Sequence, residues 1–68
     1  MNAGRPTFAQ RARIIELLAR HEFDTRTVTY AYRRLGVSED RIGRPVDTWL
    51  DSISIEQASN LIGKLEDL

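Results

Sequence analysis

The fold of this chain is decided by residues 54–65, whose sequence is SIEQASNLIGKL. Ser54 followed three residues later by Gln57 is the pattern of a capping box, in which each side chain bonds the backbone N–H of the other residue. The apolar residues that follow recur at helical spacing and share one face: Ile55, Ala58, Leu61, Ile62 and Leu65. The sequence therefore predicts an amphipathic helix over residues 55–66.

A second capping box, formed by Thr7 and Gln10, opens the N-terminal half of the chain. The residues after it place one apolar stripe at helical spacing: Phe8, Ala12, Ile15, Leu18 and Ala19. We predict a helix over residues 8–21, with this stripe as its buried face. Ile14 and Leu17 fall outside the stripe, which indicates apolar neighbours on more than one side of the helix.

Residues 25–35 give conflicting signals about secondary structure. Asp24 is a suitable N-cap and Gly36 a suitable left-handed stop for a helix between them. This segment is nevertheless rich in residues that favour strands, and Val28, Tyr30 and Tyr32 alternate as they would in a strand. Because no other segment alternates well enough to pair with such a strand, we predict a helix.

The connection over residues 37–53 contains Gly43 and Pro45, and we expect it to be irregular, with short helical turns at 39–42 and 48–51. Its apolar residues are expected to reach the core: Val46, Trp49, Leu50 and Ile53. The predicted fold is an all-α compact bundle of three main helices, over 8–21, 25–35 and 55–66. A disordered tail of residues 1–5 precedes a single domain of residues 6–68.

The composition limits the kinds of protein that the chain can be. It has 68 residues, no cysteine and one histidine, so a disulfide scaffold and a structural zinc site are excluded. A core of this size rarely supplies more than about 3 to 5 kcal/mol, so a homodimer that buries Ile14, Leu17 and Trp49 is one alternative. No apolar run approaches a membrane span or a secretory signal, and we expect a cytoplasmic protein without membrane contact.

Catalytic chemistry has little support in the sequence. His21 is the only imidazole, and it lies at a helix end without a nucleophile at a recognisable spacing. Its simpler interpretation is a C-terminal residue that interacts favourably with the helix dipole. Asp47 and Asp51 are four residues apart and could share a face and bind a cation, but such pairs on a loop are usually caps and solubilising charge. We therefore expect no enzymatic activity, no metal and no cofactor.

The net charge of zero conceals an asymmetry along the chain. Residues 1–44 contain nine arginines and five acidic residues, a net charge of +4, whereas residues 45–68 contain one lysine and five acidic residues, a net charge of −4. A molecule divided in this way can present a positive face to a polyanion. The alternative is that the two halves neutralise each other in the fold.

The predicted helix over 25–35 carries the main candidate site. Its buried stripe would be Val28, Ala31, Tyr32 and Leu35, which leaves Arg26, Tyr30, Arg33 and Arg34 on the opposite side. Arginines around an aromatic ring are typical of single-stranded nucleic-acid binding, and they are also enriched at protein-binding hot spots. A third interpretation is that the ring packs internally and the arginines are merely solvated. Arg13 and Arg20 would extend the same surface.

From Thr7 onward the sequence resembles a small helical module of bacteriophage and prophage replication and recombination proteins, often the C-terminal part of single-strand-annealing or related DNA-binding proteins. The residues that carry the resemblance are Thr7 and Gln10, Leu17 and Leu18, Gly43 and Arg44, Leu50, Ser54, Glu56, Ala58 and Ser59, Leu61, Ile62 and Leu65. The resemblance implies a helical fold more than a function, and in such proteins the module accompanies a DNA-binding domain.

These observations predict a small phage-type accessory module that binds nucleic acid, with single-stranded DNA as one candidate partner. The predicted binding residues are Arg13, Arg20, Arg26, Tyr30, Arg33, Arg34 and Arg44. The alternative is a protein-interaction module, such as a small phage inhibitor of a host DNA-processing protein, that uses the same face or the acidic C-terminal helix and acts as a monomer or a homodimer.

Overall fold

The computed structural model describes residues 4–68, and within them the chain is helical without any strand. The elements are α1 (Phe8–Arg20), the 3₁₀ helix η1 (Tyr30–Leu35), the 3₁₀ helix η2 (Glu39–Arg41), α2 (Val46–Asp51) and α3 (Ile55–Glu66). The predicted all-α fold is confirmed. Of the predicted disordered tail over 1–5, residues 1–3 lie outside the described residues.

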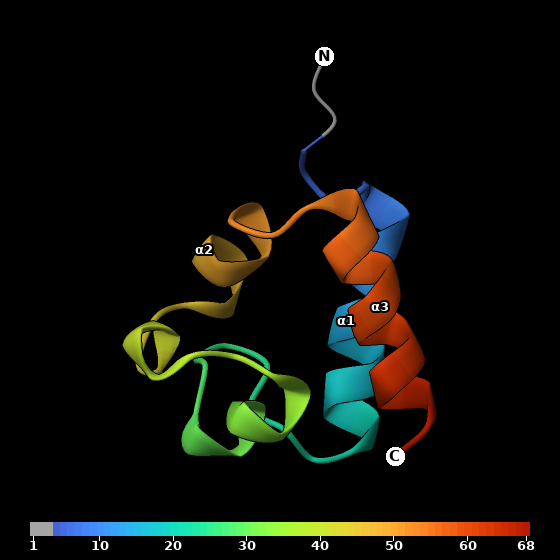
Figure 1. The fold of residues 1–68 in the computed structure, drawn as a ribbon. Coiled ribbons are helices and arrows are strands. Elements are labelled where there is room, and N and C mark those ends of the chain that lie inside the picture. The colour runs from blue at the N-terminus through green and yellow to red at the C-terminus, as the bar shows by residue number, and fades with distance from the viewer. Residues whose placement is uncertain (1–3) are drawn as a thin grey trace.

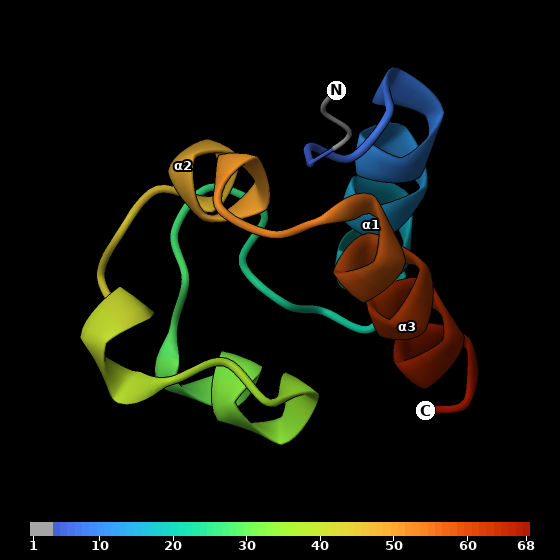
Figure 2. The same cartoon turned by 45° about the horizontal axis from the view of Figure 1, so that its top comes forward.

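The helices α1 and α3 lie side by side and begin at the same end of the molecule (Figures 1 and 2). Both predicted capping boxes are present: Thr7 Oγ1 accepts from Gln10 N at 3.1 Å, and Ser54 Oγ accepts from Gln57 N at 3.0 Å. The amide of Gln10 also donates to the carbonyl of Ile55 at 3.2 Å, from α1 to the first residue of α3. The first capping box thus fixes the start of both helices.

The end of α1 turns the chain away from α3. Phe23 N donates to Leu18 O and Glu22 N donates to Ala19 O, which is the pair of hydrogen bonds of a Schellman motif. Glu22 occupies the left-handed position with φ of 65°, where glycine is more usual. The motif places the ring of Phe23 in the core beside the last turn of the helix.

Of the predicted buried stripe of α1, Leu18 is buried as predicted, but the stripe as a whole does not face the core. Phe8 is 86% exposed, Ala12 and Ala19 are exposed and Ile15 is only partly buried, whereas the core side chains are Ile14, Leu17 and Leu18. The helix carries more apolar residues than one face can hold, so apolar spacing alone does not select the stripe that faces α3. Ile14, Leu17 and Trp49 are all buried within the chain, and the reason for expecting a homodimer through them does not hold.

The predicted helix over residues 25–35 is also wrong over its first half, because the helix begins at Tyr30 and is a 3₁₀ helix. Thr27 instead forms an isolated antiparallel bridge with Pro45. Asp24 caps a turn rather than a helix, since its carboxylate accepts from the backbone N–H groups of Arg26 and Thr27 at 2.7 and 2.9 Å. The β-branched residues of this segment adopt the extended conformation that they favour. Gly36 is left-handed, as predicted, with φ of 86°.

The extended segment pairs with residues 44–46 through backbone hydrogen bonds. Val28 N donates to Arg44 O and Val46 N donates to Arg26 O, each at 2.8 Å. The two donors are the residues after Thr27 and after Pro45. The pairing therefore needs no N–H from Pro45 itself. A proline can therefore take part in the pairing, although the segment around it has no alternating pattern.

Tyr32 lies at the centre of the core. Its ring makes edge-on contacts with Phe23 and Trp49, with ring centroids 5.5 and 5.4 Å apart. Its hydroxyl donates to the backbone carbonyl of Asp24. The core around it contains Ile14, Leu17, Leu18, Phe23, Val28, Leu35, Val46, Trp49, Leu50, Ala58, Leu61 and Leu65.

Two alanine substitutions on α1 test which face of the helix is buried. Leu17→Ala removes a side chain that is 1% exposed, and it should lower the free energy of unfolding by about 2 to 5 kcal/mol. The control, Phe8→Ala, removes a side chain that is 86% exposed and should change it by less than about 0.5 kcal/mol. Urea denaturation measures both changes. Equal losses in the two variants would show that the helix is oriented differently.

The buried phenol of Tyr32 should make the fold sensitive to alkali. Burial and the nearby carboxylate of Asp24 raise the pKa of Tyr32 from 10.0 to about 12. The folded chain therefore holds this proton more tightly than the unfolded chain, and the resulting stability is complete below about pH 10 and is lost as the pH rises through 12. In urea titrations between pH 8 and 12, Tyr32→Phe should lose less stability than the unsubstituted chain. The same decline in both would contradict this origin.

Candidate functional site

Five of the seven predicted binding residues lie together on the segment that contains the Thr27–Pro45 bridge, η1 and η2, which we name the 24–45 lobe. In Figure 1 it forms the green and yellow part of the ribbon, to one side of the paired helices α1 and α3. The five residues are Arg26, Tyr30, Arg33, Arg34 and Arg44, and all of them are exposed.

The 3₁₀ geometry of η1 changes which of these side chains share a face. With three residues per turn, side chains three apart lie in line, so Tyr32 and Leu35 form the buried row. Tyr30 and Arg33 form a second row, and Arg34 belongs to a third. The predicted α-helical face of four residues is therefore replaced by a row of two, in which Tyr30 is 70% exposed.

The arginine side chains of the lobe differ in their contacts. Arg33 Nη1 lies 3.3 Å from Glu39 Oε2, and the guanidinium of Arg34 lies 5.3 Å from the ring centroid of Phe23. Within residues 4–68 the side chain of Arg44 makes one long hydrogen bond, 3.4 Å from its Nε to Asp40 O. The backbone of Arg26 is fixed by the Thr27–Pro45 bridge, and its side chain is in no ion pair within residues 4–68.

Arg13 and Arg20 lie on α1 and not on the lobe. Arg13 is paired with Glu16 at 3.1 Å and with Glu66 at 2.9 Å, and these hydrogen-bonded carboxylates raise its pKa. Arg20 lies 3.5 Å from the other oxygen of Glu16. The structure therefore brings neither arginine to the row of Tyr30 and Arg33, and acidic neighbours balance the charge of both.

The lobe keeps a net positive charge despite its acidic residues. Residues 24–45 contain five arginines and three acidic residues, which gives +2. Backbone hydrogen bonds from Thr27 and Arg26 lower the pKa of Asp24, and a hydrogen bond from the hydroxyl of Ser38 is the largest cause that lowers the pKa of Asp40. Both carboxylates are ionised at neutral pH, so the arginines are only partly balanced.

The two aspartates considered as a cation site bind an arginine instead. Arg11 Nη1 lies 2.8 Å from Asp51 Oδ1, and its Nη2 lies 3.9 Å from Asp47 Oδ1. His21 is the C-cap residue of α1, and its backbone N–H donates to Leu17 O. Within residues 4–68, no group of three or more His, Cys, Asp or Glu side chains is arranged to hold a metal ion. In the same residues, none of the helices combines the length and apolar character of a membrane span.

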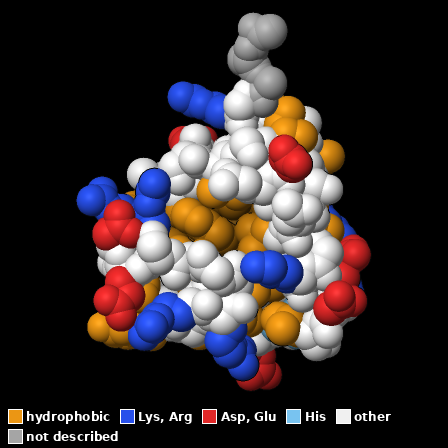
Figure 3. Space-filling view, viewed as in Figure 1, with side chains coloured by type: hydrophobic (Ala, Val, Ile, Leu, Met, Phe, Trp, Pro, Cys, Tyr) orange, Lys and Arg blue, Asp and Glu red, His pale blue; other side chains and the backbone are white. Residues whose placement is uncertain are grey.

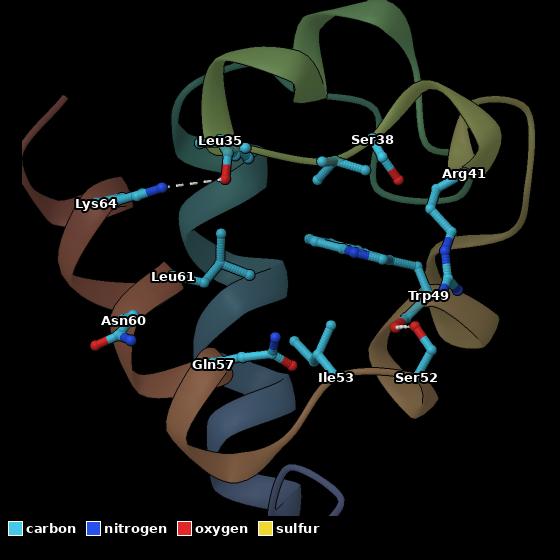
Figure 4. Close-up of a pocket in the computed structure, with 12 residues that line it drawn as sticks. Leu35, Ser38, Arg41, Trp49, Ser52, Ile53, Gln57, Asn60, Leu61 and Lys64 are labelled. Carbon is cyan, nitrogen blue, oxygen red and sulfur yellow. Dashed lines mark hydrogen bonds between the residues drawn. The ribbon is translucent and has the colours of Figure 1, made fainter.

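A cleft that the sequence did not reveal lies between the η1–η2 connection, α2 and α3 (Figure 4). Its volume is about 380 Å³. Trp49, Leu35 and Leu61 contribute an apolar surface, and Arg41 and Lys64 are the charged residues that line it. Figure 3 shows one face of the molecule, with apolar side chains exposed at its centre and both basic and acidic side chains around them. The lining comes from four separate segments, so no local sequence pattern could have predicted it.

No protein-family model, curated protein or solved structure matches this chain. The function of the chain must therefore be inferred from its exposed side chains and from the cleft.

Proposed function

We propose that this chain is a small accessory module of phage or prophage type that binds single-stranded nucleic acid through the 24–45 lobe, without catalysis or a cofactor. The observation that carries the proposal is the row of Tyr30 and Arg33 on η1, in which Tyr30 is 70% exposed. The resemblance to modules of DNA-binding phage proteins points to the same class of partner. The proposed surface contains Arg26, Tyr30, Arg33, Arg34 and Arg44.

The row of Tyr30 and Arg33 matches the chemistry of a single strand. A base stacked on an exposed aromatic ring contributes about 1 to 3 kcal/mol, and a neighbouring guanidinium can bind the adjacent phosphate. The ion pair between Arg33 and Glu39 does not prevent this. Both side chains are more than half exposed, and exposed pairs of this kind contribute at most about 1 kcal/mol, so a phosphate can displace the carboxylate.

The same residue types also occur at protein-binding hot spots, and a protein partner at this surface is the alternative outcome. The lobe favours nucleic acid because its charge is positive, at +2, while the chain as a whole is neutral. A positive lobe on a neutral molecule orients the chain toward a polyanion. Such binding should be weak at physiological salt and should strengthen as the salt concentration is lowered.

Two substitutions on η1 separate stacking from phosphate contact. Tyr30→Ala should weaken binding of a fluorescent oligothymidylate by about 1 to 3 kcal/mol, with an almost unchanged dependence on salt. Arg33→Gln should lower the slope of log affinity against log salt by about 0.7, because one phosphate contact and its counterions are lost. Fluorescence anisotropy at several salt concentrations measures both effects.

The matched control is Arg20→Gln, which removes one arginine on α1 and should leave both the affinity and the slope nearly unchanged. If the unsubstituted chain binds no oligonucleotide at low salt, the proposal is wrong. Capture of a protein partner that is lost in both the Tyr30 and the Arg33 variants would then identify the lobe as a protein-binding surface.

Removing the carboxylate that pairs with Arg33 should strengthen nucleic-acid binding, whereas the substitutions of Tyr30 and Arg33 should weaken it. Glu39→Gln removes the carboxylate 3.3 Å from Arg33, which frees the guanidinium and raises the net charge of the lobe by one. Oligothymidylate affinity should therefore rise, by a factor of about five or less for an exposed pair. In the double variant Glu39→Gln, Arg33→Gln most of the gain should disappear. An unchanged or reduced affinity in Glu39→Gln would count against phosphate contact by Arg33.

A further inference from the structure

The cleft between η2, α2 and α3 is a second candidate binding site, and it differs in chemistry from the surface around Tyr30. Trp49 is 5% exposed, and its indole ring projects between Ile53 and Leu35 in the middle of the cleft (Figure 4). Within residues 4–68 no buried side-chain nitrogen or oxygen lacks a hydrogen-bond partner. The lining of the cleft combines this apolar surface with polar side chains, among them Ser38, Gln57 and Asn60.

The charged residues that line the cleft are all basic. Arg41 and Lys64 are its only charged lining residues, and in Figure 4 they lie on opposite sides of the Trp49 ring. Neither is in an ion pair within residues 4–68. Lys64 Nζ makes one long hydrogen bond, 3.5 Å to Leu35 O, which leaves two of its three N–H donors for a ligand.

Asp40, which is next to Arg41 in the chain, offsets this charge only in part. Asp40 precedes Arg41, but its carboxylate accepts the hydroxyl of Ser38 and is not ion-paired with Arg41. Asp40 does not line the cleft. The cleft therefore presents two cations beside an apolar wall, which is complementary to carboxylates beside an apolar side chain.

The size and layout of the cleft indicate the kind of ligand. A volume of about 380 Å³ is near the lower end of known ligand sites and holds one or two large side chains. A small aromatic acid would reach only one of two cations that flank the ring on opposite sides. A peptide with acidic residues on both sides of an apolar anchor reaches both.

We propose that the cleft binds a short segment of a partner protein, in which one or two large apolar residues are flanked on each side by Asp or Glu. The apolar anchor packs on Trp49 and Leu61, and the flanking carboxylates bind Arg41 and Lys64. The cleft shares Arg41 with the 24–45 lobe but contains none of the five residues of the proposed nucleic-acid surface. The chain then connects a protein partner at the cleft with a nucleic acid at the lobe.

The test uses Trp49, the only tryptophan of the chain, as a fluorescent reporter in the intact protein. The probes are capped hexapeptides with two acidic residues, two anchors and two acidic residues, in which the anchors are drawn from Phe, Leu, Ile, Met and Tyr. We expect at least one peptide to give a saturable change in emission with a Kd below about 1 mM. Peptides with Lys in place of the acidic residues, or Ser in place of the anchors, should give none.

Variants of the two cations make the test specific. Arg41→Gln and Lys64→Gln should each weaken binding of the best peptide about fivefold, while Lys64→Arg keeps the charge and should bind nearly as well as the unsubstituted chain. The matched control is Arg26→Gln, an exposed arginine of the lobe outside the cleft, which should leave the peptide affinity unchanged. Thermal melting establishes that each variant is folded.

Several outcomes would overturn the proposal. One is the absence of any binding peptide up to about 1 mM, and another is an unchanged affinity in the folded Arg41→Gln, Lys64→Gln double variant. Phenylacetate that binds as tightly as the best peptide would assign the cleft to a small aromatic acid. A Trp49 signal that changes with protein concentration alone would assign it to a second copy of the chain. Oligonucleotide binding by the lobe is unaffected by all four outcomes.

Discussion

The edge-on packing of the Tyr32 ring against Phe23 and Trp49 is the interaction on which the rest of the structure depends. Phe23 follows α1 and Trp49 belongs to α2, and the buried phenol ring packs edge-on against both. Its hydroxyl also holds the carbonyl of Asp24, where the chain leaves α1. The lobe contains one isolated bridge and two short 3₁₀ helices, and the aromatic cluster joins it to the end of α1 and to α2. Tyr32 also sets the register of η1, because its burial turns Tyr30 and Arg33 outward.

The same cluster accounts for the cleft. One part of the Trp49 ring is covered by Tyr32, and the residue as a whole is nearly buried, yet it lines the cavity beside α3. A rigid aromatic wall of this kind costs little conformational entropy when a ligand packs on it. Arg41 and Lys64 stand on either side of that wall and come from different elements, η2 and α3. The fold therefore positions two basic sites, one at the row of Tyr30 and Arg33 and one at the cleft.

The sequence predicted those parts of the fold that local chemistry determines. The capping boxes at Thr7 and Ser54, the left-handed Gly36 and the span of α3 are local features, and all are present. The exposure of Phe8 and its neighbours on the predicted stripe was not predicted, and neither was the extended segment before Tyr30. Which side of α1 is buried depends on where α3 packs, and the partner of Thr27 is a proline segment that pairs only through its backbone. Of the candidate site, the exposure of Tyr30 could be predicted from the sequence, but the pairing of Arg13 with Glu66 and the cleft arise from tertiary packing.

The central claim is that nucleic acid binds the surface formed by Arg26, Tyr30, Arg33, Arg34 and Arg44 and leaves the paired helices and the cleft free. An amide NMR titration of the intact chain with oligothymidylate tests it most directly, because each residue reports separately. We expect progressive shifts of the amides of residues 26–34 and of Arg44, with little change in α3 or at Trp49. Shifts concentrated on α1, α3 or the cleft, or no shifts at low salt, would contradict this account.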